Sequence, residues 1–250
     1  MIADVVRAAL AVAREVVVVD SGSTDKTIAL AKEAGARVIE HEWLGNGRQK
    51  RLAEDACVHD WLLDLDADEI VTSELATEIA ALFRDGAPLH RIYVTPLALA
   101  PPVGAPWRDF GLQSRRKLYD RRAVRIPDHE AWDQFDIPEG ETVGVLKQPI
   151  LHYAFTGAEQ FMAKLNRNSS VRANALPLKP RPYLALRILF GAPFYFAKKY
   201  LLQQYFRGGV YGFALASMSA YGRWLRDVKM WERGSCEGNK SPTVNPDNNP

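Results

Sequence analysis

The stretch WLLDLDADE, residues 61–69, decides the fold, because an apolar strand ends there in a cluster of carboxylates. If residues 61–66 are extended, the leucines face one way, and Asp64 and Asp66 face the other. Carboxylates that share one face repel each other, and a bound cation removes this cost. Oxygen ligands suit Mg²⁺ or Mn²⁺, and Mg²⁺ usually takes one or two protein carboxylates together with phosphate oxygens of a substrate.

Two other interpretations of these acids need no such metal. Asp64, Asp66 and Asp68 stand at the first, third and fifth positions of a calcium loop, but Glu69 takes the sixth, where that loop needs glycine. Alternatively, Asp68 and Glu69 form a solvated turn that caps a helix starting near Ser73, because Asp and Ser favour helix starts. The sequence argues against calcium and leaves the capping turn open for those two acids.

The composition is that of a globular protein. With 250 residues, of which 47% are hydrophobic and 25% charged, the chain can form one large domain, with or without an appendage. Two cysteines, Cys57 and Cys236, cannot form a disulfide framework, which suits a reducing compartment. Residues 1–13 contain an acid and an interior arginine, so they predict a helix and not a secretory signal.

Strands and helices alternate from the N-terminus to residue 66. Four consecutive valines at 16–19 are typical of a strand that is buried on both faces. The patterns predict helices at 2–14, 26–34 and 48–56 and further strands at 38–40 and 61–66. This alternation predicts an α/β fold with a mostly parallel sheet, whose ligands bind beyond the carboxyl ends of the strands. The acidic loops at Asp20 and Asp66 both lie at such ends.

The chain opens with a helix, whereas a sheet of this kind normally opens with a strand. We therefore expect the first strand of the sheet to be missing, through an upstream start or a truncation. Downstream, the patterns predict helices at 72–85 and 157–174 and strands at 91–95, 117–119, 124–126, 143–146 and 150–153. We expect all of these segments to form one domain over residues 1–175.

Residues 176–233 differ in character and are expected to form a helical appendage. Thirteen of the 25 aromatic residues lie between 183 and 231, and residues 179–233 hold ten Lys or Arg but two acids. The longest uncharged run, 208–222, has 15 residues, fewer than the roughly 20 that a spanning helix needs. The residues that fit an amphipathic segment in a membrane interface are Phe190, Phe194, Tyr195, Lys198 and Lys199.

A buried helical subdomain or a subunit contact remains an alternative for this appendage. Nucleic acid is not an expected partner, because no recognised binding motif is present and aliphatic residues interleave the aromatics. Residues 234–250 are rich in Asn, Pro, Gly and Ser and are expected to be a disordered tail.

Three motifs in this order resemble family 2 glycosyltransferases of the GT-A fold: VVVVDSGSTD at 16–25, GNGRQK at 45–50, and WLLDLDADE. Two later motifs, DHE at 128–130 and PILHY at 149–153, are similar to those of bacterial lipopolysaccharide-core beta-glucosyltransferases. A helix with Lys164 and Asn166 adds to this likeness, which runs from about residue 2 to residue 230.

The resemblance implies roles for the acids in binding a nucleotide-sugar donor. Asp20 would hydrogen-bond uracil or ribose, and Asp25 either shares that contact or caps the following helix. Asp66 would reach the ribose, or the metal through water, and Asp68 would bind the metal that bridges the diphosphate. Lys50 would neutralise the leaving diphosphate, or else is a solvated helix charge.

The resemblance also implies the remaining catalytic groups. Glu130 matches the position of the base that takes the proton of the acceptor hydroxyl. Direct displacement assisted by one base inverts the anomeric centre, so an α-linked donor gives a β-linked product. His129 would orient Glu130 or touch phosphate, and His152 would add a metal or phosphate contact; a purely structural role is equally open for both histidines.

Two departures from the family pattern bear on these roles. The first strand and its usual Asn-Glu motif are absent, so the nucleoside pocket would lack one wall. Arg51 stands where the family usually has Asn after the Gln-Lys pair, which leaves the donor contacts of that helix open.

We therefore expect an inverting glycosyltransferase dependent on Mg²⁺ or Mn²⁺, which moves a hexose from a donor similar to UDP-glucose to a membrane-anchored bacterial glycan such as lipopolysaccharide core. It would be cytoplasmic and peripheral at the inner face of the cytoplasmic membrane. Transfer to a polyprenyl phosphate and a catalytically inactive glycan-assembly scaffold are the alternatives. Donor sugar, acceptor, linkage and oligomeric state are left open.

Overall fold

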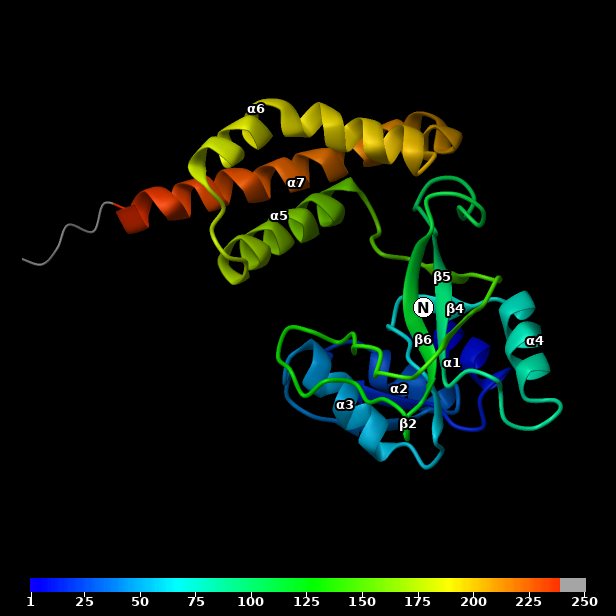
Figure 1. Ribbon diagram of the computed structural model, residues 1–250. Coiled ribbons are helices and arrows are strands. Elements are labelled where there is room, and N and C mark those ends of the chain that lie inside the picture. The colour runs from blue at the N-terminus through cyan, green and yellow to red at the C-terminus, as the bar shows by residue number, and fades with distance from the viewer. Residues whose placement is uncertain (239–250) are drawn as a thin grey trace, which may run out of the picture. The chain divides into compact units, whose positions relative to one another are not determined.

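The computed structural model describes residues 1–238 and divides into two compact units, Met1–Ala154 and the chain from Phe155 onward (Figure 1). The sequence placed residues up to 175 in the first domain, but the helix at Ala158–Ala175 packs on the last helix and so belongs to the second unit. Of the expected disordered tail, residues 234–238 continue that last helix, and residues 239–250 lie outside the described residues.

The first unit contains most of the elements that the sequence predicts. In chain order these are α1 (Ile2–Leu10), β1 (Val17–Asp20), α2 (Thr27–Glu33), β2 (Arg37–Glu40), α3 (Asn46–Ala56), β3 (Trp61–Leu63), β4 (Glu69–Val71), α4 (Ser73–Leu82), β5 (Ile92–Leu99), β6 (Gln113–Asp120), β7 (Val143–Val145) and β8 (Ile150–His152). Strand β4 was not predicted, because the acids before it masked a three-residue strand. The strand expected at 124–126 is absent, since Ile126 bonds the side chain of Glu54 instead of a neighbouring strand.

The strands form two sheets, and their directions are more mixed than expected. Strands β1 and β2 form a parallel pair, while the larger sheet has the order β3-β6-β5-β8-β4, with β7 also on β5. In that sheet β5 runs parallel to β7 and β8, but the pairs β3–β6, β5–β6 and β4–β8 are antiparallel. The α/β class is confirmed. A mostly parallel sheet would need long crossover connections, and β5 is joined to β6 by a loop without a helix.

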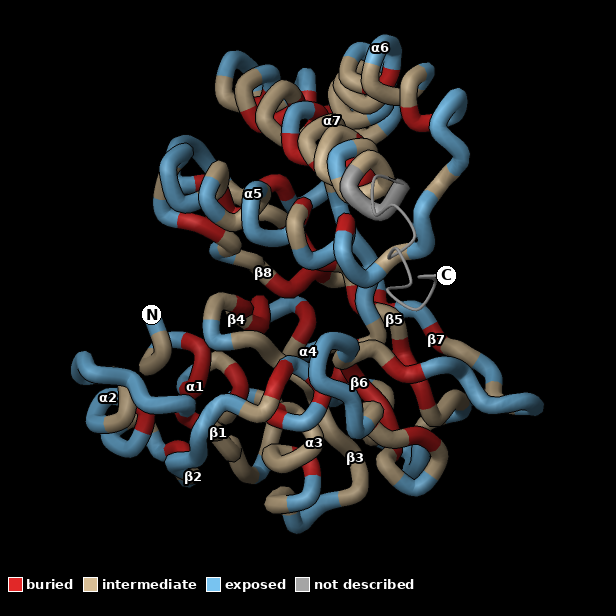
Figure 2. The backbone as a smooth tube through the Cα atoms, turned by 90° about the vertical axis from the view of Figure 1, so that its left-hand side faces the viewer, coloured by how far each residue is buried: buried red, intermediate tan, exposed pale blue. Residues whose placement is uncertain are grey.

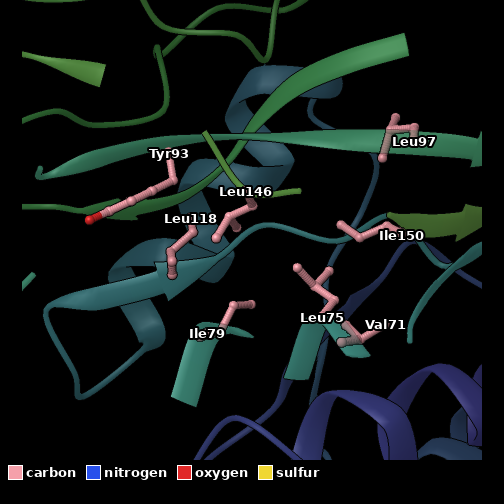
Figure 3. Packing of buried hydrophobic residues seen from close by; sticks show 8 residues of the cluster. All are labelled: Val71, Leu75, Ile79, Tyr93, Leu97, Leu118, Leu146 and Ile150. Atoms are coloured by element: carbon pink, nitrogen blue, oxygen red, sulfur yellow. The ribbon is translucent and has the colours of Figure 1, made fainter. Parts of the chain in front are cut away.

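Helix α4 packs on the larger sheet, and the side chains between them form the main core (Figure 3). Leu75 and Ile79, one turn apart, are both buried against side chains of β4, β5, β6 and β8. The hydroxyl of Thr72 caps the helix by accepting the N–H of Leu75 at 3.2 Å, and it donates to the carbonyl of Pro149 at 2.9 Å. The start of α4 is thereby fixed to the start of β8. Figure 2 shows the buried stretches that run along β4, β5, β6 and β8.

Helices α1 and α2 pack on the two-stranded sheet around Val6 and Ala31. The valines of β1 were expected to be buried on both faces, but they are only half-buried. The physical reason is that β1 pairs with β2 on one side, while β1 and β3 line a cavity of about 700 Å³. Among the described residues no strand precedes α1.

The second unit is helical. It consists of α5 (Ala158–Ala175), α6 (Arg181–Ala197), a π-helical turn at Lys198–Leu202, a 3-10 turn at Tyr205–Gly208, and α7 (Gly209–Gly238). Figure 1 shows α5 and α6 beside α7. The buried carboxylate of Asp227 on α7 accepts hydrogen bonds from Nη2 of Arg187 on α6 at 2.7 and 3.1 Å and from its Nε at 3.0 Å. Among residues 1–238, no helix combines the length and the apolar character needed to cross a membrane.

Candidate active site

Helix α3 connects the loops that carry the candidate site residues. Near its start, the amide of Gln49 donates to the hydroxyl of Ser21 at 3.0 Å, in the loop after Asp20. The next residue, Lys50, reaches the acidic loop, which we define as residues 64–69. The first N–H groups of the helix meet residues 127–133, which we call the base loop because it contains Glu130. Segments far apart in sequence therefore meet at one helix.

Asp20 ends β1 and shapes the loop that follows it. Its Oδ1 accepts the N–H groups of Gly22 at 2.9 Å and Ser23 at 2.8 Å. Hydrogen bonding from Ser23 outweighs burial and lowers the pKa of the Asp20 carboxyl below its usual value. Asp20 is thus held as a carboxylate at the carboxyl end of a parallel strand.

Asp25 lies at the start of α2. Its Oδ1 accepts the N–H of Thr27 at 2.9 Å, and its side chain is otherwise exposed. This hydrogen bond reaches the first turn of α2, although Lys26 and not Asp25 is the N-cap residue. The donor role of Asp25 stays a prediction.

The side chain of Lys50 is surrounded by three carboxylates. Its Nζ lies 3.0 Å from Asp64 Oδ2, 2.7 Å from Asp66 Oδ1 and 3.0 Å from Asp133 Oδ2. Burial opposes the charge on Lys50, but these three acids outweigh it and raise the lysine pKa. Asp133, which the sequence did not single out, connects the base loop to the acidic loop through this lysine.

A second lysine, Lys117 of β6, lies beneath the acidic loop. Only 2% of its side chain is exposed, and its Nζ lies 2.6 Å from Oε2 of Glu69, which is 1% exposed. That same oxygen accepts the N–H of Asp66 at 3.0 Å, so buried Glu69 steadies this turn and is not part of a solvated one. Its Oε1 is buried without a hydrogen-bond partner in the described part of the chain. Lys117 was missed, although a charged residue in the buried half of a strand is itself a signal of a buried partner.

The two lysines change the interpretation of the acidic cluster. Asp64 is nearly buried and pairs with Lys50 at 3.0 Å and with Lys117 at 3.8 Å. Burial opposes ionisation of Asp66, but Lys117 and Lys50 outweigh it and lower the pKa of Asp66 to about 2. The ammonium groups of Lys50 and Lys117 therefore relieve the repulsion between the Asp64 and Asp66 carboxylates.

Asp68 and His152 lie together at the pairing of β4 with β8. The Nε2 of His152 is 3.5 Å from Oδ2 of Asp68, and the N–H of Tyr153 donates to the Asp68 carbonyl at 2.8 Å. Residues 1–238 contain no cluster of three or more His, Cys, Asp or Glu side chains arranged to hold a metal ion. An ion held by this carboxylate and imidazole would take its other ligands from phosphate and water.

Glu130 lies on the base loop with its carboxylate exposed. Within residues 1–238 that carboxylate accepts no hydrogen bond and forms no ion pair. The preceding residue, His129, uses its Nδ1 to accept the N–H groups of Ala131 at 3.0 Å and Trp132 at 3.1 Å. His129 therefore shapes the loop that carries Glu130, and its contact with phosphate stays a prediction.

The cavity lined by β1 and β3 is bordered by Lys50 and Asp66 among the predicted site residues. Its walls are mainly apolar strand and helix residues, but Gln49, Lys50, Asp64 and Asp66 also line it. A volume of about 700 Å³ lies within the range of small-molecule sites, roughly 300–1,000 Å³. Acidic and basic groups thus border a partly apolar space large enough for a small ligand.

Comparison with known proteins assigns this arrangement to a class. The model of the family described as Glycosyl transferase family 2 matches residues 1–127. An uncharacterized glycosyltransferase of Rickettsia felis is 32% identical over 232 residues, which cover 87% of this chain and 80% of the relative. The lipopolysaccharide core biosynthesis glycosyltransferase LpsC of Rhizobium meliloti is 28% identical over 230 residues, which cover 88% of this chain and 83% of the relative.

The protein is therefore a glycosyltransferase. It belongs to glycosyl transferase family 2, because the family model spans half of the chain and the Rickettsia relative aligns over most of both sequences. The crystal structure of residues 1–349 of S. aureus TarS is 16% identical with a TM-score of 0.40, over 96% of this chain and 89% of that one. Similarity at that level does not define a shared site or substrate.

Proposed function

We propose that this glycosyltransferase moves a hexose from a nucleoside diphosphate sugar, of the UDP-glucose type, to a hydroxyl of a membrane-anchored bacterial glycan such as lipopolysaccharide core. The observation that carries the proposal is Lys50, which bridges Asp66 of the acidic loop and Asp133 of the base loop. One ion-pair network thereby connects the segment proposed to bind the donor with the segment proposed to deprotonate the acceptor. The name of LpsC supports the class of acceptor.

In this proposal the donor binds across the carboxyl ends of β1 and β3. Asp20 and Asp66 are ionised carboxylates and can accept hydrogen bonds from a base or ribose. Lys50 contacts the diphosphate only by giving up one of its present carboxylate partners. Asp133 is the candidate, because it lies on a loop and its side chain is about one-third exposed.

Asp68 and His152 are the residues proposed to hold a divalent ion. Their polar atoms are 3.5 Å apart and both side chains are partly exposed. A carboxylate and an imidazole together suit Mn²⁺ better than Mg²⁺, which prefers oxygen ligands. When bound, such an ion supplies neutralisation of the charge on the leaving diphosphate.

Glu130 is proposed as the base. Its exposed carboxylate has both oxygens available to accept the proton of an acceptor hydroxyl. The hydroxyl oxygen forms a bond to the anomeric carbon as the bond to the diphosphate oxygen breaks, and the proton passes to Glu130. A single displacement of this kind inverts the anomeric centre.

The acceptor is proposed to be reached at an anionic membrane surface through α6. Leu186, Leu189, Phe190 and Phe194 follow helical spacing and are 57–70% exposed; we call them the α6 apolar face. The opposite side of α6 is buried in the second unit through Leu184. Exposed Lys198 follows at the end of this helix, so the apolar face is continuous with positive charge.

The proposal is tested by UDP release from UDP-glucose in the presence of vesicles that contain a lipid-linked glycan. We expect release that requires Mn²⁺ or Mg²⁺, is abolished by a chelator, and is lost in Asp68→Ala. Exposed Asp85→Ala serves as the control acid and should leave release unchanged. Release that is insensitive to both the chelator and Asp68→Ala would refute the metal site, and absence of any release would favour the inactive scaffold.

A further inference from the structure

The start of α3 touches the backbone of the base loop at two glycines. A Cβ on Gly45 would lie 2.3 Å from the carbonyl oxygen of Glu130, and one on Gly47 would lie 2.1 Å from that of Trp132. Gly45 also has φ of +99°, so its conformation by itself favours glycine. Gly47 lies inside the helix, where alanine is normally preferred, so only the close approach of the base loop requires glycine there.

The same approach satisfies the first N–H groups of the helix. Those of Asn46 and Gly47 donate to the carbonyls of Glu130 at 2.7 Å and His129 at 3.1 Å, and that of Arg48 also reaches His129 at 3.3 Å. Helix N–H groups at this end have no partner within the helix, and here the base loop supplies the acceptors. The start of α3 is thus bound to the base loop by backbone hydrogen bonds.

The segment that enters the base loop is held further along the same helix. Arg51 donates from Nη1 to the carbonyl of Ile126 at 2.7 Å. The buried carboxylate of Glu54 accepts the N–H of Ile126 at 3.0 Å and the hydroxyl of Tyr119 at 2.7 Å. Arg51, whose contacts the sequence left open, thus has a definite structural partner.

We propose that α3 is a positioning helix for the base loop, with Gly47 and Arg51 as positioning residues that set Glu130 relative to the acidic loop. The inference rests on the proposed function, in which Glu130 is the base. Lys50, which lies next to Arg51 on α3, contacts Asp66 of the acidic loop, where the donor is proposed to bind. A shift of the base loop away from α3 therefore changes the distance between Glu130 and the donor. Such a shift lowers the rate of transfer without removing a donor contact.

The test is Gly47→Ala, compared with Gly234→Ala. Gly234 also lies in a helix, but a Cβ there would meet Leu178 at 3.8 Å, an ordinary contact. We expect Gly47→Ala to lower kcat roughly tenfold to 100-fold while the KM for donor stays near the wild-type value. Backbone hydrogen exchange should rise in peptides covering 126–133 and stay unchanged over 61–69. Gly234→Ala should change neither quantity.

Unchanged exchange over 126–133 in Gly47→Ala overturns the inference, and so does raised exchange with unchanged kcat. If Gly47→Ala does not fold, Arg51→Met provides the same readouts, because it keeps the aliphatic stem but removes the donor to Ile126. Retained turnover in Glu130→Gln would instead remove Glu130 as the base. The exchange measurement would still report whether α3 holds the loop, so the two failures are distinguishable.

Discussion

In the first unit the charges of the acidic loop are paired with two lysines, whereas in the second unit apolar side chains of α6 are exposed to solvent. Buried charge is tolerated where partners and hydrogen bonds surround it, as they do around Lys50 and Lys117. Exposed apolar area at helical spacing has no such internal partner and points to an external one. This difference supports the proposal that the chemistry belongs to the first unit and that the second unit contacts a membrane surface.

The largest expected effect is on the stability of the first unit. Lys117→Met leaves Glu69 buried without a counter-charge, and we expect it to lower the free energy of unfolding by about 3–5 kcal/mol in chemical denaturation. Exposed Lys147→Met should change it by less than about 0.5 kcal/mol. The double variant with Glu69→Gln should recover much of the loss. Equal effects at Lys117 and Lys147 would show that the buried pair does not hold the acidic loop.

The second unit contains a buried charge of its own, at Asp227. Asp227→Asn leaves Arg187 and Arg226 without a carboxylate, and we expect a loss of about 3 kcal/mol. Because the two units are separately compact, hydrogen exchange should rise over 158–238 more than over 1–154. An equal rise in both ranges would mean that they unfold as one cooperative body.

The α6 apolar face is expected to matter for membrane contact and not for folding. Phe190→Ser combined with Phe194→Ser should reduce co-sedimentation with anionic vesicles while shifting the unfolding free energy by less than about 0.5 kcal/mol. Leu89→Ser is the matched control, because Leu89 is 88% exposed but lies in the first unit. If the double variant and the control bind vesicles equally well, α6 is not the contact surface. Dimer dissociation in the double variant alone would favour a subunit contact.

A smaller effect concerns the pH dependence of stability through Asp66. Its pKa is about 2 in the folded protein, below the value of about 3.9 in an unfolded chain. A lowered pKa contributes stability above the unfolded pKa, and this contribution is lost as pH falls from about 4 towards 2. The stability difference between wild type and Asp66→Asn should therefore be larger at pH 6 than at pH 3. An equal difference at both values would contradict the pairing of Asp66 with the lysines.

The sequence predicted the parts of the site that depend on local pattern. Asp20 and the acidic loop follow strands whose apolar runs are visible, and helix α3 follows its glycine loop. Asp133 and Glu54 could not be found in this way, because their partners lie on other elements and depend on how these elements pack. Lys117 carried a signal, as a charged residue in a strand, but that signal did not identify its partners. The antiparallel pairing of β4 with β8, which brings His152 to Asp68, likewise depends on a three-residue strand without a distinct pattern of its own.

The burial of β1 shows a different limit. A run of valines predicts burial on both faces only if strands or helices cover both sides, and here one side lines a cavity. The hydrophobic pattern shows that both faces of the strand can be buried. It does not show whether another strand or helix covers each face. Arg51 is a second example, since its partner at Ile126 lies on another segment and is set by packing.

The most direct test of the central claim is single-turnover transfer by Glu130→Gln. We predict that the single-turnover rate constant of transfer falls by about 100-fold or more, because the amide cannot accept the hydroxyl proton, while the dissociation constant for UDP in the presence of Mn²⁺ stays close to that of the wild type. Transfer at the wild-type rate by Glu130→Gln would contradict the assignment of the base and with it the proposed role of the base loop.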